Sequence, residues 1–233
     1  MGPLGQEKPA FCLVTDRRRL AGATAKSADA KRCLVAQAGH AVAAGIHLIQ
    51  LRERDLQAGE LAAIARDLLA VTRGTATRLV INDRLDVALA CGADGVHLRG
   101  DSIPVAAARR IAPAGFLIGR SVHSAGDAGQ ASGADYLIAG TVFPTHSKRS
   151  AQVLLGLDGL RAIVAAASAP VLAIGGIAAE HCDEVADAGA AGIAAIGLFI
   201  AAELETGGDE SSYCRAICLI VCRVFDWSHL FRT

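Results

Sequence analysis

Short apolar runs alternate with longer alanine-rich segments of helical period from residue 11 onward, which is typical of repeated strand–helix units. The apolar runs predict eight strands, at residues 11–15, 46–52, 78–82, 95–98, 116–122, 136–139, 171–174 and 192–196. The longer segments predict eight helices, at residues 28–44, 58–71, 85–90, 105–111, 125–131, 157–167, 179–188 and a last one after Ile200.

Four of the predicted helices are followed by a glycine-containing junction, at residues 44–46, 91–95, 132–135 and 188–192. Glycine suits a helix C-terminus because it adopts the left-handed conformation without a steric penalty. An open doubly wound sheet would show the same alternation, but no Gly-x-Gly-x-x-Gly follows the first strand and polar strand ends are spread over the whole chain. The repetition therefore predicts a single α/β domain, a (β/α)8 TIM barrel with parallel strands over residues 11–203.

Both ends of the chain depart from this repeat. Residues 1–10 predict a flexible N-terminal segment, which has no apolar core and so resembles neither a signal peptide nor a membrane anchor. Residues 204–233 predict an atypical C-terminal tail, either the last barrel helix or an appendage. Cys214, Cys218 and Cys222 share one helical face there. Packed thiols are favoured over a metal site, because no histidine pair stands at zinc spacing.

Charge and cysteine content narrow the class of function. The 23 basic and 23 acidic residues balance, no basic run occurs and aromatics are few, which excludes a nucleic-acid groove and an anionic membrane surface. No uncharged apolar run is long enough for a spanning helix. Seven cysteines, several of them inside helical patterns, argue against a disulfide framework and predict a cytoplasmic protein. A small-molecule enzyme fits these features.

In a parallel barrel all strands point their C-terminal ends to one face, so the polar residues at those ends converge. After the second predicted strand, Gln50, Arg52 and Arg54 lie on one side, and an amide with two guanidinium groups suits a phosphate or carboxylate. The alternative is a solvated loop in which Glu53 and Asp55 balance the arginines.

Acidic side chains follow the third and fourth predicted strands. Asp83 comes after Asn82, and Asp101 stands in the run 99–102. Two acids from adjacent strand ends suit a shared magnesium ion. Helix capping explains both positions equally well, since capping also favours acids and hydroxyls there.

The later strand ends add hydroxyls, a cation and glycines. The long loop 140–149 carries Thr145, Ser147 and Lys148 and predicts a lid or substrate loop. Residues 174–177 and 195–198 follow the last two strands, where backbone N–H groups can approach an anion, and these two loops form the usual phosphate site of such barrels; the relevant residues are Gly175, Gly176, Ile196 and Gly197.

The fifth predicted strand ends in the polar run Ser121-Val122-His123-Ser124. Buried polar groups require hydrogen-bonding partners, so this run meets either a ligand or well-paired loop residues. His97 lies between two apolar residues in mid-strand, where a role in the core is favoured over catalysis.

Together these motifs resemble the thiamine phosphate synthase/TenI family over residues 11–203. The matching stretches are 49–53 (Ile-Gln-Leu-Arg-Glu), 81–84 (Ile-Asn-Asp-Arg), 92–98 (Gly-Ala-Asp-Gly-Val-His-Leu), 142–145 (Val-Phe-Pro-Thr) with Lys148, and 173–177 (Ala-Ile-Gly-Gly-Ile). The resemblance implies a thiamine-biosynthesis enzyme that acts on a thiazole phosphate and that is compatible with a homodimer.

Synthases of this family join a hydroxymethylpyrimidine diphosphate to the thiazole phosphate and release magnesium-bound pyrophosphate. The resemblance assigns the diphosphate and the pyrimidine to Gln50, Arg52, Asn82 and Lys148, and magnesium to Asp83. The chain departs from the synthase pattern at Arg54, where lysine is usual, and at residues 99–102, which read Arg-Gly-Asp-Ser where Gly-Gln-Glu-Asp is usual. The second magnesium acid thus falls on Ser102, with Asp101 one residue early.

The run 119–124 and the Arg52-Glu53-Arg54 sequence are more similar to the TenI branch, which is associated with a thiazole tautomerase. That reaction moves a proton and needs no metal or other cofactor, only an acid/base and anion binders. His123 is the predicted acid/base because its ordinary pKa lies near neutrality, with Ser121 and Lys148 beside it. Arg52 and Arg54 hold the carboxylate, the four glycine-loop residues bind the phosphate, and Thr145, Ser147 and Lys148 close over it.

Three hypotheses follow for the function. The favoured one is the tautomerase, the second is a magnesium-dependent synthase in which Asp101 replaces the usual second acid, and the third is a non-catalytic thiamine-related binding barrel. The position of Asp101 relative to Asp83 discriminates between the first two: converging carboxylates favour the synthase and diverging ones the tautomerase.

Overall fold

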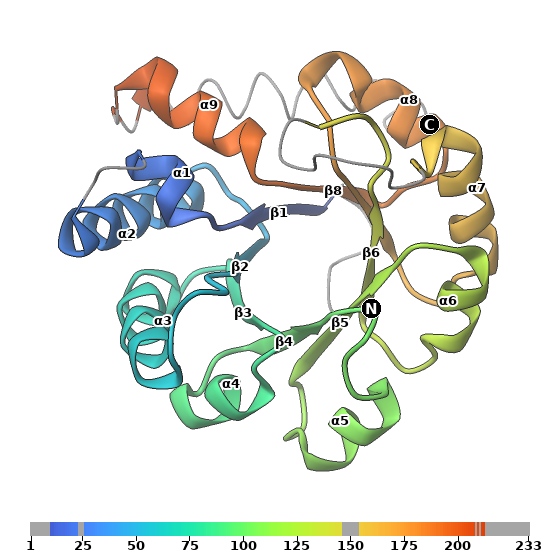
Figure 1. Cartoon of the computed structure of the whole chain (residues 1–233), viewed down its shortest axis with the longest axis horizontal. Helices are drawn as coiled ribbons and strands as arrows, with labels where there is room; N and C mark the ends of the chain where they lie inside the picture. Colours follow the sequence, from blue (N-terminus) through green and yellow to red (C-terminus); the bar gives the residue numbers. More distant parts are fainter. Residues whose placement is uncertain (1–9, 23–25, 146–153, 208, 210, 213–233) are drawn as a thin grey trace, which may run out of the picture.

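Eight parallel strands close into a barrel in which each strand pairs with its neighbours in sequence and β1 pairs with β8 (Figure 1). This computed structural model describes residues 10–22, 26–145, 154–207, 209, 211 and 212. The strands are β1 (Ala10–Val14), β2 (Leu48–Leu51), β3 (Arg78–Asn82), β4 (Gly95–Leu98), β5 (Leu117–Val122), β6 (Tyr136–Gly140), β7 (Val171–Ile174) and β8 (Gly192–Ala195). The predicted TIM barrel is confirmed. The three tail cysteines, and all but residue 10 of the predicted N-terminal segment, lie outside the described residues.

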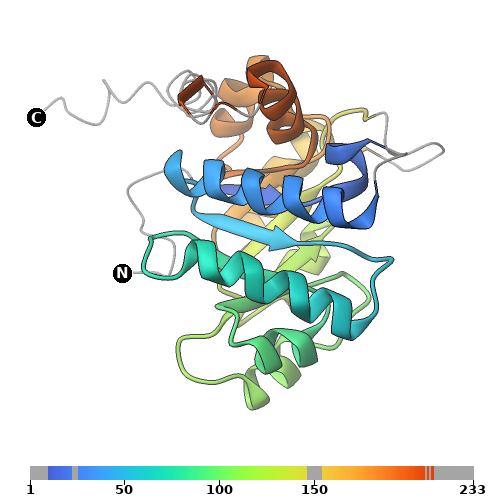
Figure 2. The ribbon, with the colours of Figure 1, turned by 90° about the vertical axis from the view of Figure 1, so that its left-hand side faces the viewer.

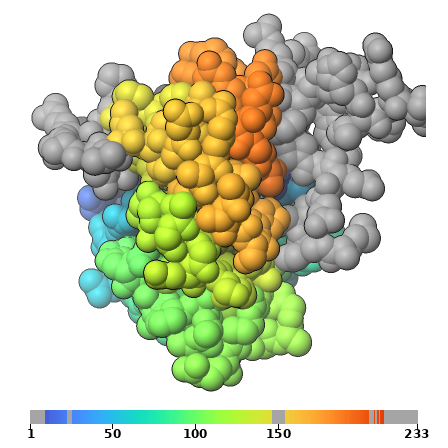
Figure 3. All heavy atoms as spheres, turned by 90° about the vertical axis from the view of Figure 1, so that its right-hand side faces the viewer, coloured from blue at the N-terminus to red at the C-terminus, as the bar shows by residue number. Residues whose placement is uncertain are grey.

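Helices cover the outside of the barrel, and α2 and α3 lie side by side on it (Figure 2). The helices are α1 (Arg17–Ala21), α2 (Ser27–Ala43), α3 (Ala58–Thr72), α4 (Leu85–Cys91), α5 (Val105–Ile111), α6 (Ala125–Gln130), α7 (Gly156–Ala166), α8 (Cys182–Asp187) and α9 (Gly197–Thr206), with a 3-10 turn η1 (Ala179–His181) before α8. In Figure 3 the outer surface passes from green through yellow to orange, so segments that follow one another in sequence also follow one another around the barrel. Among the described residues no helix is long and apolar enough to cross a membrane.

Two helix starts differ from the prediction. A short helix, α1, directly follows β1, where the sequence pattern predicted none; the Asp16 carboxylate caps it by accepting a hydrogen bond from Arg19 N at 3.1 Å. The last helix begins at Gly197, not after Ile200. Phe199 is 1 % exposed, so the apolar residues that follow β8 already belong to a helix packed on the barrel.

Apolar side chains form two separate cores, one inside the barrel and one between the strands and the helices. Alternate residues of a strand point to opposite faces, so Cys12 and Val14 point inward while Phe11 and Leu13 pack under the helices. Inside the barrel, burial raises the pKa of the Cys12 thiol to about 12, which keeps it protonated and unreactive.

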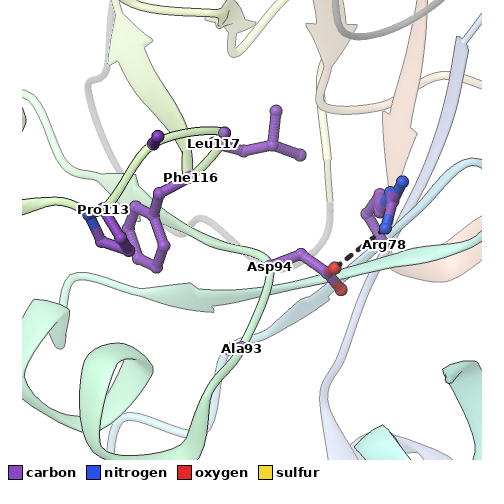
Figure 4. Close-up of a pocket in the computed structure, with 8 residues that line it drawn as sticks. Arg78, Ala93, Asp94, Pro113, Phe116 and Leu117 are labelled. Atoms are coloured by element: carbon purple, nitrogen blue, oxygen red, sulfur yellow. Dashed lines mark hydrogen bonds and ion pairs between the residues drawn. The ribbon is translucent and has the colours of Figure 1, made fainter.

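Two aspartates at the amino-terminal end of the barrel, before β4 and β6, bind the strand that precedes each of them. Asp94, before β4, accepts hydrogen bonds from Leu79 N at 2.8 Å and from Arg78 Nη1 at 3.2 Å, and it borders a hollow of about 340 Å³ (Figure 4). Asp135, before β6, accepts from Ile118 N at 2.7 Å and from Arg109 Nη2 at 2.6 Å. The aspartates of the two Gly-Ala-Asp junctions, Asp94 and Asp135, thus have the same role. Each accepts a hydrogen bond from a backbone N–H of the preceding strand and pairs with an arginine.

Candidate functional site

A cavity of about 1590 Å³ opens at the carboxyl-terminal end of the strands. Every strand contributes at least one wall residue; the contributors nearest the floor are Val14, Gln50, Asn82, His97, Ser121, Ile138, Ile174 and Ala194. Pockets for a single drug-sized ligand usually measure about 300–1,000 Å³. The volume of this cavity therefore fits two substrates better than one.

The structure brings most of the predicted site residues into this cavity. Those that line it are Gln50, Arg52, Arg54, Asn82, Asp101, Ser121, His123, Thr145, Gly175, Gly176, Ile196 and Gly197. Asp83 does not line the cavity itself, but its carboxylate is hydrogen-bonded to Ser102 and to Arg99, which does. Ser147 and Lys148 lie outside the described residues.

The two carboxylates expected to balance the β2-loop arginines pair with α1 instead. Arg17 is 7 % exposed and donates to Glu53 Oε2 at 2.8 Å and to Asp55 at 2.7 and 2.6 Å. Arg18 adds a 2.7 Å contact to Asp55. The interpretation of the β2 loop as an internally balanced, solvated segment is therefore wrong. The hydrogen bonds to Arg17 lower the pKa of Asp55 to about 2.

This buried network also fixes the start of the β2 loop. The Thr15 hydroxyl donates to Glu53 Oε1 at 2.8 Å and accepts from Arg52 N at 2.9 Å. The Arg52 backbone is thus held while its guanidinium faces the cavity. Burial, and then the charge of Arg54, lowers the pKa of Arg52. The charges of Asp16 and Glu53 offset part of this effect, but neither carboxylate forms an ion pair with Arg52 or Arg54 in the described part of the chain. Two neighbouring guanidinium groups therefore remain available to an anion at this wall.

An arginine from α1, which the sequence pattern did not predict, also lines the cavity. Arg19 comes from α1, and its Nη2 lies 3.5 Å from the position that a Cβ on Gly197 would occupy. It therefore adds a positive charge where the N–H groups of the first turn of α9 are unpaired, which is the arrangement that binds phosphate. The signal in the sequence is the run Arg17-Arg18-Arg19 directly after β1, but only the fold separates its three roles.

The carboxylates of Asp83 and Asp101 both contact one positively charged side chain, that of Arg99. Arg99 donates from Nη1 to Asp83 Oδ2 at 3.3 Å and from Nη2 to Asp101 Oδ2. Ser102 donates its hydroxyl to Asp83 Oδ1 and accepts from Arg99 N at 2.9 Å. Asp83 has a φ of 63°, which aspartate tolerates better than most residues. Converging carboxylates at Asp83 and Asp101 are the arrangement predicted for a synthase, so their shared contact with Arg99 favours the synthase over the tautomerase.

His123 lies at the exposed mouth of the cavity, after β5. Its backbone N donates to Asp127 Oδ2 at 2.9 Å, and its Nδ1 is hydrogen-bonded to the Gly140 carbonyl. A carbonyl only accepts, so Nδ1 carries a hydrogen and Nε2 is the nitrogen that can exchange a proton. The ring lies over Gly100, with Nε2 3.8 Å from the position of a Cβ there.

The glycines after β7 permit a close approach to the β6 loop. Gly175 and Gly176 have φ values of 101° and 66°. A Cβ on Gly175 would lie 2.5 Å from Thr141 Cγ2, and one on Gly176 would lie 2.6 Å from Phe143 O. Only glycine fits both the backbone conformation and the contact, which holds the β6 loop with Thr145 against the cavity.

Comparison with known proteins identifies the family. The family model described as thiamine monophosphate synthase matches residues 13–199. A thiamine-phosphate synthase of Methanoregula boonei is 48% identical over 162 residues, covering 69% of this chain and 75% of that protein. A putative thiamine-phosphate synthase of Geobacter sulfurreducens is 42% identical over 191 residues, covering 81% and 85%. The solved structure of a thiamine phosphate pyrophosphorylase from Pyrococcus furiosus is similar, with a TM-score of 0.74 at 34% identity over 94% of this chain and 98% of that one. The chain belongs to the thiamine monophosphate synthase family.

Proposed function

We propose that this protein is a thiamine phosphate synthase, which joins a hydroxymethylpyrimidine diphosphate to a thiazole phosphate. One observation supports the proposal above all. The carboxylates of Asp83 and Asp101 both contact the guanidinium group of Arg99, beside a cavity with room for two substrates. The sequence alone favoured the tautomerase, but the similar proteins named above are described as a thiamine-phosphate synthase, a putative one and a thiamine phosphate pyrophosphorylase, which supports the second hypothesis.

The diphosphate binds against the β2 and β3 strand ends. Arg52 and Arg54 offer guanidinium groups with no carboxylate contact among the described residues, and a planar guanidinium binds phosphate oxygens in pairs. Gln50 is buried below them, and its Nε2 donates to Asn82 Oδ1 at 3.4 Å, so the two amides form one polar platform for the pyrimidine. Lys148 of the β6 loop completes this site in the proposal.

The donor set at Asp83 and Asp101 fits magnesium. Magnesium binds through one or two carboxylates together with substrate phosphates and keeps several waters. Asp83 and Asp101, which both contact Arg99, would supply the carboxylate oxygens, and the substrate diphosphate and water would supply the other ligands. Bound there, Mg²⁺ would neutralise charge on the diphosphate leaving group.

The thiazole phosphate binds on the opposite side of the mouth. Ile196 and Gly197 at the start of α9, together with Gly175 and Gly176, offer backbone N–H groups to its phosphate, and Arg19 adds a charge. In the reaction the C–O bond between the pyrimidine methylene and the diphosphate breaks, and the diphosphate keeps the electron pair. The thiazole ring nitrogen then supplies the pair for the new C–N bond. The chain's contribution is to hold the two reacting atoms together and exclude water.

The test is to incubate the purified protein with both substrates and to measure thiamine phosphate and pyrophosphate with and without Mg²⁺. Equal amounts of the two products, lost on chelation, support the proposal. Asp101→Asn should raise the Mg²⁺ concentration for half-maximal rate by at least about 10–100-fold, the loss seen even for outer partners of a metal site.

Asp158→Asn is the matched control for the magnesium variants, because its side chain is fully exposed on α7. A wild-type protein that forms no thiamine phosphate contradicts the proposal. So does an Asp101→Asn variant whose magnesium requirement equals that of Asp158→Asn.

The tautomerase remains the second candidate because His123 presents Nε2 at the cavity mouth. An imidazole so placed can move a proton between two carbons of a bound thiazole carboxylate. Incubation with the ylidene substrate should then give the aromatic thiazole in the absence of Mg²⁺, and His123→Asn should abolish this turnover. Full activity of His123→Asn in that assay, or no turnover by the wild type, rules out the second candidate.

A further inference from the structure

A polar column runs through the barrel below the cavity, made of one residue from each of three adjacent strands. His97 on β4 and Tyr136 on β6 are 2 % and 0 % exposed. His97 Nδ1 lies 3.2 Å from the Tyr136 hydroxyl, and His97 Nε2 lies 2.8 Å from the Ser121 Oγ on β5. Ser121 and His97 line the cavity, whereas Tyr136 does not. The column therefore connects the barrel interior with the ligand site.

A glycine makes this column possible. His97, Gly119 and Tyr136 are register partners across β4, β5 and β6, so Gly119 lies between the two rings. A Cβ at Gly119 would lie 2.5 Å from the Tyr136 hydroxyl and 2.6 Å from His97 Nδ1. Ser121 is two residues further along β5 and points to the same interior face. Gly119 of β5 therefore leaves room for the rings of His97 and Tyr136, and Ser121 of the same strand places its hydroxyl on the cavity side of His97.

The direction of the hydrogen bonds follows from counting hydrogens. In the described part of the chain the Tyr136 hydroxyl has one hydrogen-bonding partner, His97 Nδ1, and a buried hydroxyl hydrogen needs an acceptor. Nδ1 must then lack a hydrogen. An imidazole whose Nδ1 lacks a hydrogen is neutral and carries its one N–H on Nε2. Nε2–H donates to Ser121 Oγ, which leaves the Ser121 hydrogen for the cavity.

We propose that Tyr136 and His97 are positioning residues that hold the Ser121 hydroxyl as a hydrogen-bond donor toward the cavity. The reverse arrangement would leave the Tyr136 hydroxyl hydrogen unpaired inside the barrel, and it would turn Ser121 into an acceptor. This point of the cavity therefore selects an acceptor atom, which is an anionic oxygen or a ring nitrogen of an aminopyrimidine. The ligand assignment rests on the proposed synthase function, whereas the tautomer of His97 does not.

The direct test is nitrogen NMR of the full chain labelled with 15N-histidine at neutral pH, with His97→Gln used for assignment. We expect a neutral His97 with hydrogen on Nε2 and an unprotonated Nδ1. Tyr136→Phe keeps the ring in the gap at Gly119 but removes the hydroxyl, so the 15N signal of the unprotonated Nδ1 should shift because this nitrogen loses its hydrogen-bond donor. A wild-type His97 with hydrogen on Nδ1, or with both nitrogens protonated, overturns the proposal even if Tyr136→Phe fails to fold.

The second test is kinetic and uses the coupling reaction. In Tyr136→Phe the Ser121 hydroxyl is no longer held as a donor toward the ligand. The loss of this one hydrogen bond should lower kcat/KM for the pyrimidine diphosphate about tenfold, while KM for the thiazole phosphate stays unchanged. His97→Gln keeps a donor near the Nε2 position and should retain more activity than His97→Leu. A Tyr136→Phe variant that is as active as the wild type, while Ser121→Ala is impaired, overturns the positioning role.

Binding measurements distinguish the two possible acceptors, a diphosphate oxygen and a pyrimidine ring nitrogen. They do not depend on the coupling reaction, so they remain informative if the synthase proposal fails. If Ser121 donates to the diphosphate, Ser121→Ala weakens binding of inorganic pyrophosphate; if it donates to the ring, the same change weakens binding of the hydroxymethylpyrimidine alcohol. A change that weakens neither contradicts a donor role toward the ligand. An absence of coupling activity with the expected His97 tautomer would instead refute the synthase and leave the column intact.

Discussion

The two ends of the barrel differ in how their arginines are paired. The carboxyl-terminal end combines paired arginines, such as Arg99 with Asp83 and Asp101, with arginines that contact no carboxylate among the described residues. At the amino-terminal end Arg78 pairs with Asp94 and Arg109 with Asp135, and each carboxylate also accepts a strand N–H. At the carboxyl-terminal end the guanidinium groups of Arg52 and Arg54 face a cavity and contact no carboxylate in the described ranges. A charge that the chain compensates itself stabilises the fold, and one that it leaves uncompensated is available to a ligand.

The contrast recurs within three consecutive residues. Arg17 is buried against Glu53 and Asp55, Arg18 reaches Asp55 from the surface, and Arg19 turns to the first turn of α9. A net charge of zero over the chain hides this separation. The predictions below test it by removing compensated and uncompensated charges separately.

The largest expected effect is that of Arg17→Met on stability. The substitution leaves Glu53 buried without its ion pair, and removing one partner of a buried pair costs about 3–5 kcal/mol. Urea unfolding should show this loss, whereas Arg18→Met, with 70% of its side chain exposed, should change the free energy of unfolding by less than about 1 kcal/mol. Equal stability of the two variants would contradict the assigned difference.

Arg52→Ala should affect catalysis and leave the fold intact. Losing a hydrogen-bonding cation to a charged ligand weakens binding by about 1.5–3 kcal/mol, which is about 100-fold in kcat/KM at the upper end. Arg78→Ala removes the same charge from the opposite end and serves as the control, with unchanged kcat/KM. Comparable kinetic losses in both variants would show that the two ends do not differ in the way described.

Asp94→Ala should have a smaller effect, and on stability alone. It leaves Leu79 N without its acceptor and Arg78 without its partner, which costs about 1–3 kcal/mol. For a chain of this size each kcal/mol corresponds to about 2–4 °C in Tm. Asp158→Ala is the exposed control, and a kcat/KM below that of this control would mean that the amino-terminal end contributes to catalysis.

The smallest effect concerns pH. Arg17 lowers the pKa of Asp55 to about 2, below the usual value of about 3.9 for aspartate. The stabilisation by this carboxylate is therefore fully present above about pH 4 and disappears as the pH falls through about 2. The free energy of unfolding of Asp55→Asn should lie below that of the wild type at pH 6 and approach it at pH 2. A difference that stays constant over this range would exclude the linkage.

The barrel and most of its cavity residues follow from the sequence, because the apolar period marks each strand and a parallel barrel brings every strand end to one face. The role of Arg19 does not follow, since it depends on α1, a short helix whose start is set by the Asp16 cap. The partners of Glu53 and Asp55 come from a different strand loop, so local charge balance misassigned them.

The choice between the two reactions also required three-dimensional structure. Sequence register placed Asp101 one residue away from the expected acid, and a one-residue shift on a regular strand would turn it to the other face. Residues 99–102 instead form a loop in which Arg99 reaches both Asp83 and Asp101. The irregular backbone of this loop therefore removes one of the arguments that favoured the tautomerase, the register shift of Asp101.

We expect the guanidinium groups at the carboxyl-terminal end that contact no carboxylate among the described residues to bind a diphosphate. Calorimetric titration of hydroxymethylpyrimidine diphosphate with Mg²⁺ into the wild type, Arg52→Ala and Arg78→Ala measures this directly. We expect saturable binding to the wild type and to Arg78→Ala with equal Kd, and a Kd raised about 100-fold in Arg52→Ala. No binding to the wild type, or the same Kd in all three proteins, would contradict it.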